Sequence, residues 1–143
     1  MSALVLDASV AVKWFLPAQD EALVPQALDL LARHTKSELR FLVPDLFWAE
    51  MGNIFWKAVR TRRCPRHYAE ESAVSLRAKD LTTVSSRELM SDALAIAITF
   101  DRTVYDSLYV ALAVSHNIPL VTADERLANA LAAKLPVKWL GAF

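Results

Sequence analysis

Short apolar runs alternate with longer segments of helical periodicity along the whole chain, and this alternation constrains the fold most. The runs predict strands at residues 4–6, 41–43, 81–84, 118–122 and 137–140. The segments between them predict helices at about 9–16, 20–33, 45–63, 65–79, 85–100, 104–116 and 124–134. Strands that alternate with helices predict an α/β fold, here a three-layer α/β/α sandwich around a mostly parallel sheet of four or five strands.

Length and composition exclude several classes of protein. The chain has 143 residues, which predicts one domain over 1–143. It has two glycines, Gly52 and Gly141, so it lacks the glycine-rich loops that cradle dinucleotides and nucleotide phosphates. The single cysteine, Cys64, excludes an intramolecular disulfide and a thiolate zinc cluster, and it fits a reducing compartment. Neither a signal peptide nor a membrane-spanning segment is recognisable, so we expect a cytoplasmic protein without membrane attachment.

Acidic residues follow or flank the predicted strands. Asp7 comes directly after the first strand, and Asp124 lies two residues after Thr122 at the end of the fourth. Glu50 and Asp106 lie on the helices that follow the second strand and precede the fourth. Because the carboxyl ends of parallel strands share one edge of the sheet, where ligands bind, we expect these acids to converge there.

Converging carboxylates repel one another unless a cation lies among them. Oxygen donors without histidine or thiolate favour Mg²⁺ or Mn²⁺, and the chemistry that such sites most often serve is phosphoryl transfer with metal-activated water. Ser9, Asn53 and Thr122 are placed to orient such ligands. A simpler explanation exists for each residue, since acids and hydroxyls are common at helix starts, and it stays open at this point.

Basic residues are concentrated between residues 57 and 79. The whole chain is neutral, with 16 Lys and Arg against 16 Asp and Glu, but this segment holds seven basic residues against two acidic ones. Its first part is a candidate phosphate-binding strip, which consists of Lys57, Arg60, Arg62, Arg63 and Arg66. The same residues also suit the solvated C-terminal end of a helix.

Four segments resemble the acidic motifs of the PIN-domain ribonucleases, and more narrowly of the VapC-type toxins. These are residues 5–17 (VLDASVAVKWFLP), 44–53 (PDLFWAEMGN), 105–113 (YDSLYVALA) and 120–127 (LVTADERL). The resemblance implies a metal-dependent endoribonuclease, with Asp7, Glu50, Asp106 and Asp124 as catalytic and metal-binding acids around Mg²⁺ or Mn²⁺. It also implies an RNA substrate, a homodimer and a cognate VapB-type antitoxin.

Two other functions remain open on the residues alone. A binding module of the same fold would hold RNA or a protein without cutting it, its acids serving as caps and solvated charges. A phosphoryl-accepting α/β domain would be either receiver-like or of the haloacid-dehalogenase type, and the latter would need a second acid two residues after the first. Ser9 stands at that position, which argues against the haloacid-dehalogenase type.

Overall fold

The computed structural model describes residues 2–143. Its strands are β1 (Ser2–Leu6), β2 (Leu39–Pro44), β3 (Leu81–Val84), β4 (Leu120–Thr122) and β5 (Val137–Trp139). Its α-helices are α1 (Ala8–Ala11), α2 (Val24–Thr35), α3 (Leu46–Arg60), α4 (Arg66–Arg77), α5 (Ser86–Phe100), α6 (Val104–His116) and α7 (Glu125–Leu131). Three short 3₁₀ turns, Val12–Trp14, Ala18–Asp20 and Leu140–Ala142, complete the described elements.

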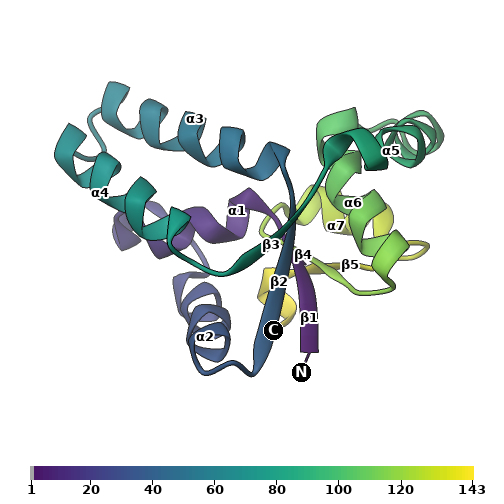
Figure 1. The fold of residues 1–143 in the computed structure, drawn as a ribbon, viewed down its shortest axis with the longest axis horizontal. Helices are drawn as coiled ribbons and strands as arrows, with labels where there is room; N and C mark the ends of the chain where they lie inside the picture. Colours follow the sequence, from purple (N-terminus) through teal and green to yellow (C-terminus); the bar gives the residue numbers. More distant parts are fainter. Residues whose placement is uncertain (1) are drawn as a thin grey trace.

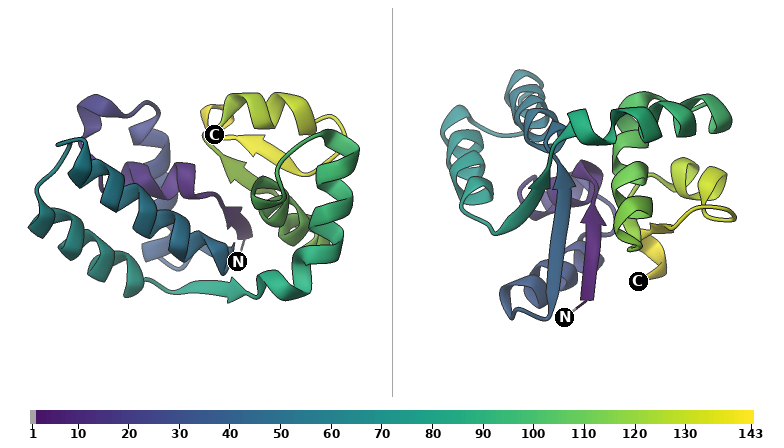
Figure 2. Two further views of the ribbon diagram at one scale, coloured as in Figure 1. Left: turned by 90° about the horizontal axis from the view of Figure 1, so that it is seen from above. Right: turned by 45° about the vertical axis from the view of Figure 1, so that its right-hand side comes forward.

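The five strands form one parallel sheet in the order β3-β2-β1-β4-β5. Helices α1 to α4 lie on one side of it and α5 and α6 on the other, with α7 beside β5 (Figures 1 and 2). This arrangement confirms the predicted three-layer fold. The chain moves outward from β1 to β2 and β3, then returns to the other side of β1 at β4. The strand order therefore reverses between β1 and β4, and this switch point is where open α/β sheets bind ligands.

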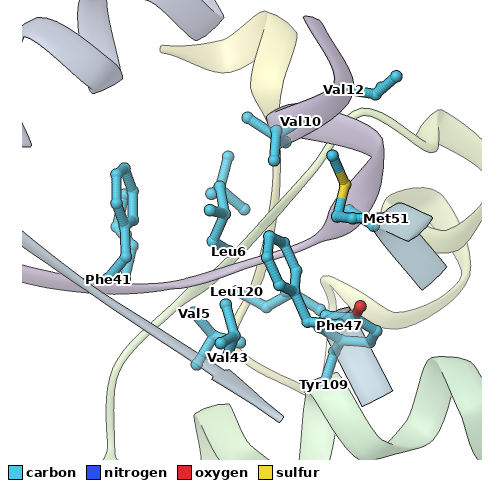
Figure 3. Close-up of a cluster of buried hydrophobic side chains, with 14 of the residues drawn as sticks. Val5, Leu6, Val10, Val12, Phe41, Val43, Phe47, Met51, Tyr109 and Leu120 are labelled. Carbon is cyan, nitrogen blue, oxygen red and sulfur yellow. The ribbon is translucent and has the colours of Figure 1, made fainter. Parts of the chain in front are cut away.

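The core lies between the sheet and its helices. The strands β1, β2 and β4 are buried almost throughout, as both covered faces of a parallel sheet require. Side chains of β1 and β2 meet Phe47 and Met51 of α3 and Tyr109 of α6 in one cluster (Figure 3). Tyr109 is only 1% exposed, so its hydroxyl group needs a partner within the protein.

The segment from Ala8 to Leu23 differs most from the predicted elements. The helix predicted over 9–16 becomes one α-turn followed by a 3₁₀ turn, and the helix predicted from residue 20 begins only at Val24. Leu23 has the left-handed φ of 60° just before α2, which interrupts any helix running through it. Asp20 and Glu21 instead pair with Arg63, which lies more than 40 residues away in the sequence.

Asp45 precedes α3 at the position where an Asp side chain commonly caps a helix, but its side chain makes no cap bond. Its Oδ1 accepts hydrogen bonds from the backbone amide and the hydroxyl group of Ser86, which link the start of α3 to the start of α5. No helix within residues 2–143 combines the length and apolar character that crossing a bilayer requires.

Candidate functional site

Asp7 lies at the end of β1, next to β4. Its amide donates to the carbonyl group of Val121 at 3.2 Å, which continues the β1–β4 pairing by one residue. Its carboxylate Oδ2 accepts two hydroxyl groups, from Ser9 at 2.6 Å and from Thr122 at 2.8 Å. Asp7 makes no side-chain cap to α1, so its carboxylate serves this cluster and not the helix end.

The backbone fixes the direction of both hydroxyl groups. Ser9 Oγ accepts the amide of Ala123 at 3.0 Å, and Thr122 Oγ1 accepts the amide of Asp124 at 3.0 Å. Because a hydroxyl oxygen that accepts an amide still has its own proton to donate, both protons are aimed at Asp7. The predicted supporting residues Ser9 and Thr122 therefore hold Asp7 in one orientation, with Thr122 fully buried.

Glu50 lies on the second turn of α3 and faces α6. Its Oε1 accepts the hydroxyl group of Tyr109 at 2.9 Å. Burial, together with the negative charges of Asp7 and Glu50, raises the pKa of Tyr109 far above its ordinary value. The phenol therefore stays protonated at any working pH and serves as a permanent donor to Glu50.

Asp106 and Asp124 occupy the starts of two helices. Asp106 lies in the first turn of α6, and its amide donates to Thr103 Oγ1 at 3.1 Å. Asp124 caps α7, because its Oδ1 accepts the amide of Leu127 at 3.1 Å. The capping explanation that the sequence left open thus holds for one oxygen of Asp124.

Three of the four acids have carboxyl groups that are harder to ionise than usual. Burial raises the pKa of Asp7, and the negative charge of Asp106 adds to it. Burial also raises the pKa of Glu50, with contributions from Asp7 and Asp106. The pKa of Asp106 is raised by burial and then by Asp124, while Arg102 opposes the shift. Each of the four predicted acids therefore lies within electrostatic reach of at least one other, with Asp106 coupled to each of the other three, and no ion pair among the described residues uses any of them.

The chemistry of these donors fits an oxygen-preferring divalent cation, which would offset the repulsion between the acids. A hard cation is the usual counterion for desolvated carboxylates without histidine or thiolate neighbours. As the side chains stand, however, no three His, Cys, Asp or Glu groups within residues 2–143 are arranged to hold a metal ion. An ion held by three of these acids at once would therefore require side-chain rotation, and the acids on α3 and α6 are only half-buried.

Asn53 lies one turn after Glu50 on the exposed side of α3. Both line an open hollow of about 380 Å³. Its other lining residues are Leu46, Ala49, Ile54 and Tyr105. The structure thus places Asn53 beside the acids and not among them, since it makes no contact with Asp7, Asp106 or Asp124 in the described hydrogen bonds.

The predicted basic strip lies at the other end of α3, around the α3–α4 turn (Figure 1). Arg60 is ten residues beyond Glu50, which corresponds to about 15 Å along a helix. Arg63 pairs with Asp20 and Glu21, Arg66 pairs with Glu70, and the Arg60 guanidinium lies over the Trp56 ring. Lys57 and Arg62 are exposed.

Two residues of the site went unrecognised in the sequence. Tyr109 lies one turn after Asp106, and this i, i+3 spacing was the available signal that it faces the same side of α6. Arg102 lies just before α6, where its Nη2 donates to the carbonyl group of Arg126 at 3.1 Å and its charge acts on Asp106. No spacing pattern points to Arg102, because its hydrogen-bond partner Arg126 lies on α7, 24 residues later in the sequence.

Comparison with known proteins identifies the family. The PIN domain family model matches residues 4–132. The chain belongs to the PIN domain family. Ribonuclease VapC3 of Pyrobaculum aerophilum is 34% identical to this PIN domain over 132 residues, which cover 88% of this chain and 92% of the relative.

Solved structures share the fold of this PIN domain. The crystal structure of PAE2754 from Pyrobaculum aerophilum has a TM-score of 0.66 at 21% identity, over 99% of this chain and 85% of that one. A toxin–antitoxin complex from Klebsiella pneumoniae has a TM-score of 0.63 at 14% identity, over 94% and 95% of the two chains. These likenesses confirm the fold expected from the resemblance.

Proposed function

We propose that this PIN domain is a divalent-metal-dependent endoribonuclease that hydrolyses RNA phosphodiester bonds, and that it is the toxin of a VapBC-type pair. The observation that carries the proposal is the set of acids at the β1–β4 switch point: Asp7, Glu50 and Asp106 are partly buried and have pKa values raised by burial and by neighbouring acids, Asp124 adds an exposed carboxylate beside Asp106, and none has an ion-pair partner among the described residues. The 34% identity to a ribonuclease over nearly the whole chain supports it.

Asp7, Glu50, Asp106 and Asp124 would hold Mg²⁺ or Mn²⁺. Such an ion, when bound, neutralises phosphate charge and activates water for attack on phosphorus. The chain's own contribution is orientation. Ser9 and Thr122 fix Asp7, while Tyr109 fixes Glu50, so two acids from different layers face the same space. Because water is the nucleophile in this proposal, the RNA 2′-hydroxyl group takes no part in the reaction.

Cleavage of a single-stranded oligoribonucleotide tests the proposal. We expect cleavage with Mn²⁺ or Mg²⁺, none after chelation by EDTA, and products with 5′-phosphate and 3′-hydroxyl ends. A cyclic 2′,3′-phosphate product would contradict attack by water. RNA binding without cleavage in either metal would favour the non-catalytic binding module instead.

We propose that RNA phosphates are recognised at two places. The salt dependence of RNA affinity distinguishes them. Arg102 lies at the acids, whereas the predicted strip of Lys57, Arg60, Arg62, Arg63 and Arg66 lies at the α3–α4 end. A residue that contacts one phosphate reduces the slope of log affinity against log salt by about 1 when its charge is removed. We expect this reduction for Arg102→Gln. If removal of both charges in Arg62→Gln/Arg63→Gln leaves the RNA affinity and the slope unchanged, this result counts against RNA binding by the strip.

The partners form part of the same proposal. A VapB-type antitoxin is supported by the structural neighbours, several of which are described as toxin–antitoxin complexes. A homodimer is supported by an exposed apolar stripe on α5, where Met90, Leu94 and Ile98 repeat every four residues on one face. A cytoplasmic location agrees with the free, buried thiol of Cys64.

A further inference from the structure

Tyr105 presents an aromatic ring to solvent directly before the acid Asp106. It is 65% exposed, although its neighbours at 107 to 113 are all buried. Burying the ring would contribute favourably to the free energy of folding, so the exposure of Tyr105 does not serve the stability of the fold. Tyr105 lines the 380 Å³ hollow described above.

The remaining walls of this hollow come from α3. Leu46, Ala49 and Ile54 give it an apolar lining, and Asn53 provides an amide that can both donate and accept hydrogen bonds. Glu50 is the only charged residue among those that line it. An aromatic wall, an apolar floor and one amide suit a flat, partly polar group, and a volume near 400 Å³ is typical of small-ligand sites.

We propose that this hollow is a nucleobase subsite in which Tyr105 stacks on a base next to the cleaved phosphate and Asn53 contacts the edge of that base. The inference rests on the proposed ribonuclease function and deepens it. The hollow adjoins the acid cluster, because Glu50 belongs to both. A phosphate held at the acids therefore places an adjoining nucleoside at Tyr105.

The subsite implies an unpaired substrate. Bases in a duplex are stacked on one another and cannot enter a hollow, whereas bases of single strands and loops are free to stack on aromatic side chains. Stacking tolerates any base, while the Asn53 amide adds a preference through hydrogen bonds to base edges. Tyr105 is thus a specificity residue, and it takes no part in the bond-breaking step.

Stacking is measured directly with oligoribonucleotides that carry 2-aminopurine, whose fluorescence is quenched when it stacks. The variants are Tyr105→Ala, Tyr105→Phe and, as a matched control, Phe143→Ala. Phe143 is also an exposed aromatic residue, but it lies at the C-terminus, by the opposite edge of the sheet (Figure 1). Binding is measured with Ca²⁺, an oxygen-preferring cation, so that the acids can hold a phosphate, and cleavage is measured separately with Mn²⁺.

We expect quenching at one position of the bound strand in wild type, in Tyr105→Phe and in Phe143→Ala, and its loss in Tyr105→Ala. In cleavage, Tyr105→Ala should raise KM by about 5-fold or more, the usual effect of removing one stacking residue, with a much smaller change in kcat. Quenching and KM that are unchanged in Tyr105→Ala would overturn the subsite. The subsite would also be overturned if Tyr105→Ala lost binding to a copurified protein partner but still bound RNA as wild type does. The hollow would then be a protein-docking site.

The outcomes separate this inference from the proposed function. If wild type binds and quenches but never cleaves, the ribonuclease proposal fails while the base subsite stands. If wild type cleaves and Tyr105→Ala behaves as wild type, the subsite fails and the ribonuclease proposal stands. Failure to bind RNA at all contradicts both.

Discussion

Asp106→Asn is expected to slow RNA cleavage by at least about 100-fold and, in metal-free buffer, to make the protein more stable than wild type. The loss of activity follows because changes in groups that merely orient a metal ligand already cost 10–100-fold. The gain in stability follows because the negative charges of Asp7, Glu50 and Asp124 lie within reach of Asp106. We expect the unfolding midpoint to rise by roughly 2–4 °C, which corresponds to about 1 kcal/mol in a chain of this size.

Metal should reverse this order of stability. At an Mn²⁺ concentration of about 100 times its Kd, wild type gains about 2.7 kcal/mol of stability, whereas Asp106→Asn largely loses the response. Asp92→Asn is the matched control, since Asp92 is an exposed acid on α5. Thermal unfolding of the three proteins with and without Mn²⁺ gives the comparison. Equal responses in all three would show that Asp106 does not bind the ion.

The same acids set the sign of the pH dependence. The pKa values of Asp7, Glu50 and Asp106 are raised in the fold, so the folded chain keeps protons that the unfolded chain has already released above about pH 4. The metal-free protein should therefore lose stability as the pH rises through the raised pKa values. Mn²⁺ competes with these protons, so its stabilising effect should grow over the same interval. Asp106→Asn should flatten both trends.

Glu21→Gln is expected to destabilise the fold by about 3 kcal/mol, because removing one partner of a buried ion pair leaves the other charge uncompensated. Glu21 Oε1 binds Lys13 Nζ at 3.2 Å, and its Oε2 binds Arg63 Nη2 at 2.9 Å. The side chains of Lys13 and Glu21 are only 9% and 13% exposed. The midpoint of thermal unfolding should fall by roughly 6–12 °C.

A second ion pair of this chain provides the matched control. Arg66 and Glu70 pair at 2.6 Å on the surface of α4, with side chains 85% and 63% exposed. Exposed pairs contribute at most about 1 kcal/mol, so Glu70→Gln should shift the midpoint by no more than roughly 4 °C. If Glu21→Gln and Glu70→Gln lower the unfolding midpoint equally, burial of the Lys13–Glu21 pair adds nothing to the stability of the fold.

Local patterns explain why some elements could be predicted from the sequence. Helix α6 runs over the predicted residues because Thr103 caps its start and Asn117 ends it in a left-handed conformation. The acids at the strand ends could likewise be anticipated, since each strand and its following residue are adjacent in the sequence. On this basis the sequence predicts Asp7 and Asp124 at the same edge of the sheet, and the parallel pairing of β1 with β4 confirms that edge.

Contacts between distant residues explain what could not be predicted. Asp45 fails as a cap because Ser86, 41 residues later, takes its carboxylate. Glu21 leaves the predicted helix because Arg63 pairs with it across 42 residues. The hydrogen bond from Tyr109 to Glu50 spans 59 residues, and nothing in either local segment signals it. Sequence patterns report neighbours along the chain, whereas these bonds depend on the order of the strands in the sheet.

The pairing of β1 with β4 has a consequence for how the protein matures. Thr122, which orients Asp7, is 115 residues further along the chain, and Asp124 follows it. A chain still emerging from the ribosome can already have β1, β2 and β3 in place, yet its Asp7 carboxylate lacks the hydroxyl group from β4. The acid cluster is thus completed only when nearly the whole polypeptide has been synthesised and its last third has docked, so under the proposed function we expect partly made chains to be inactive.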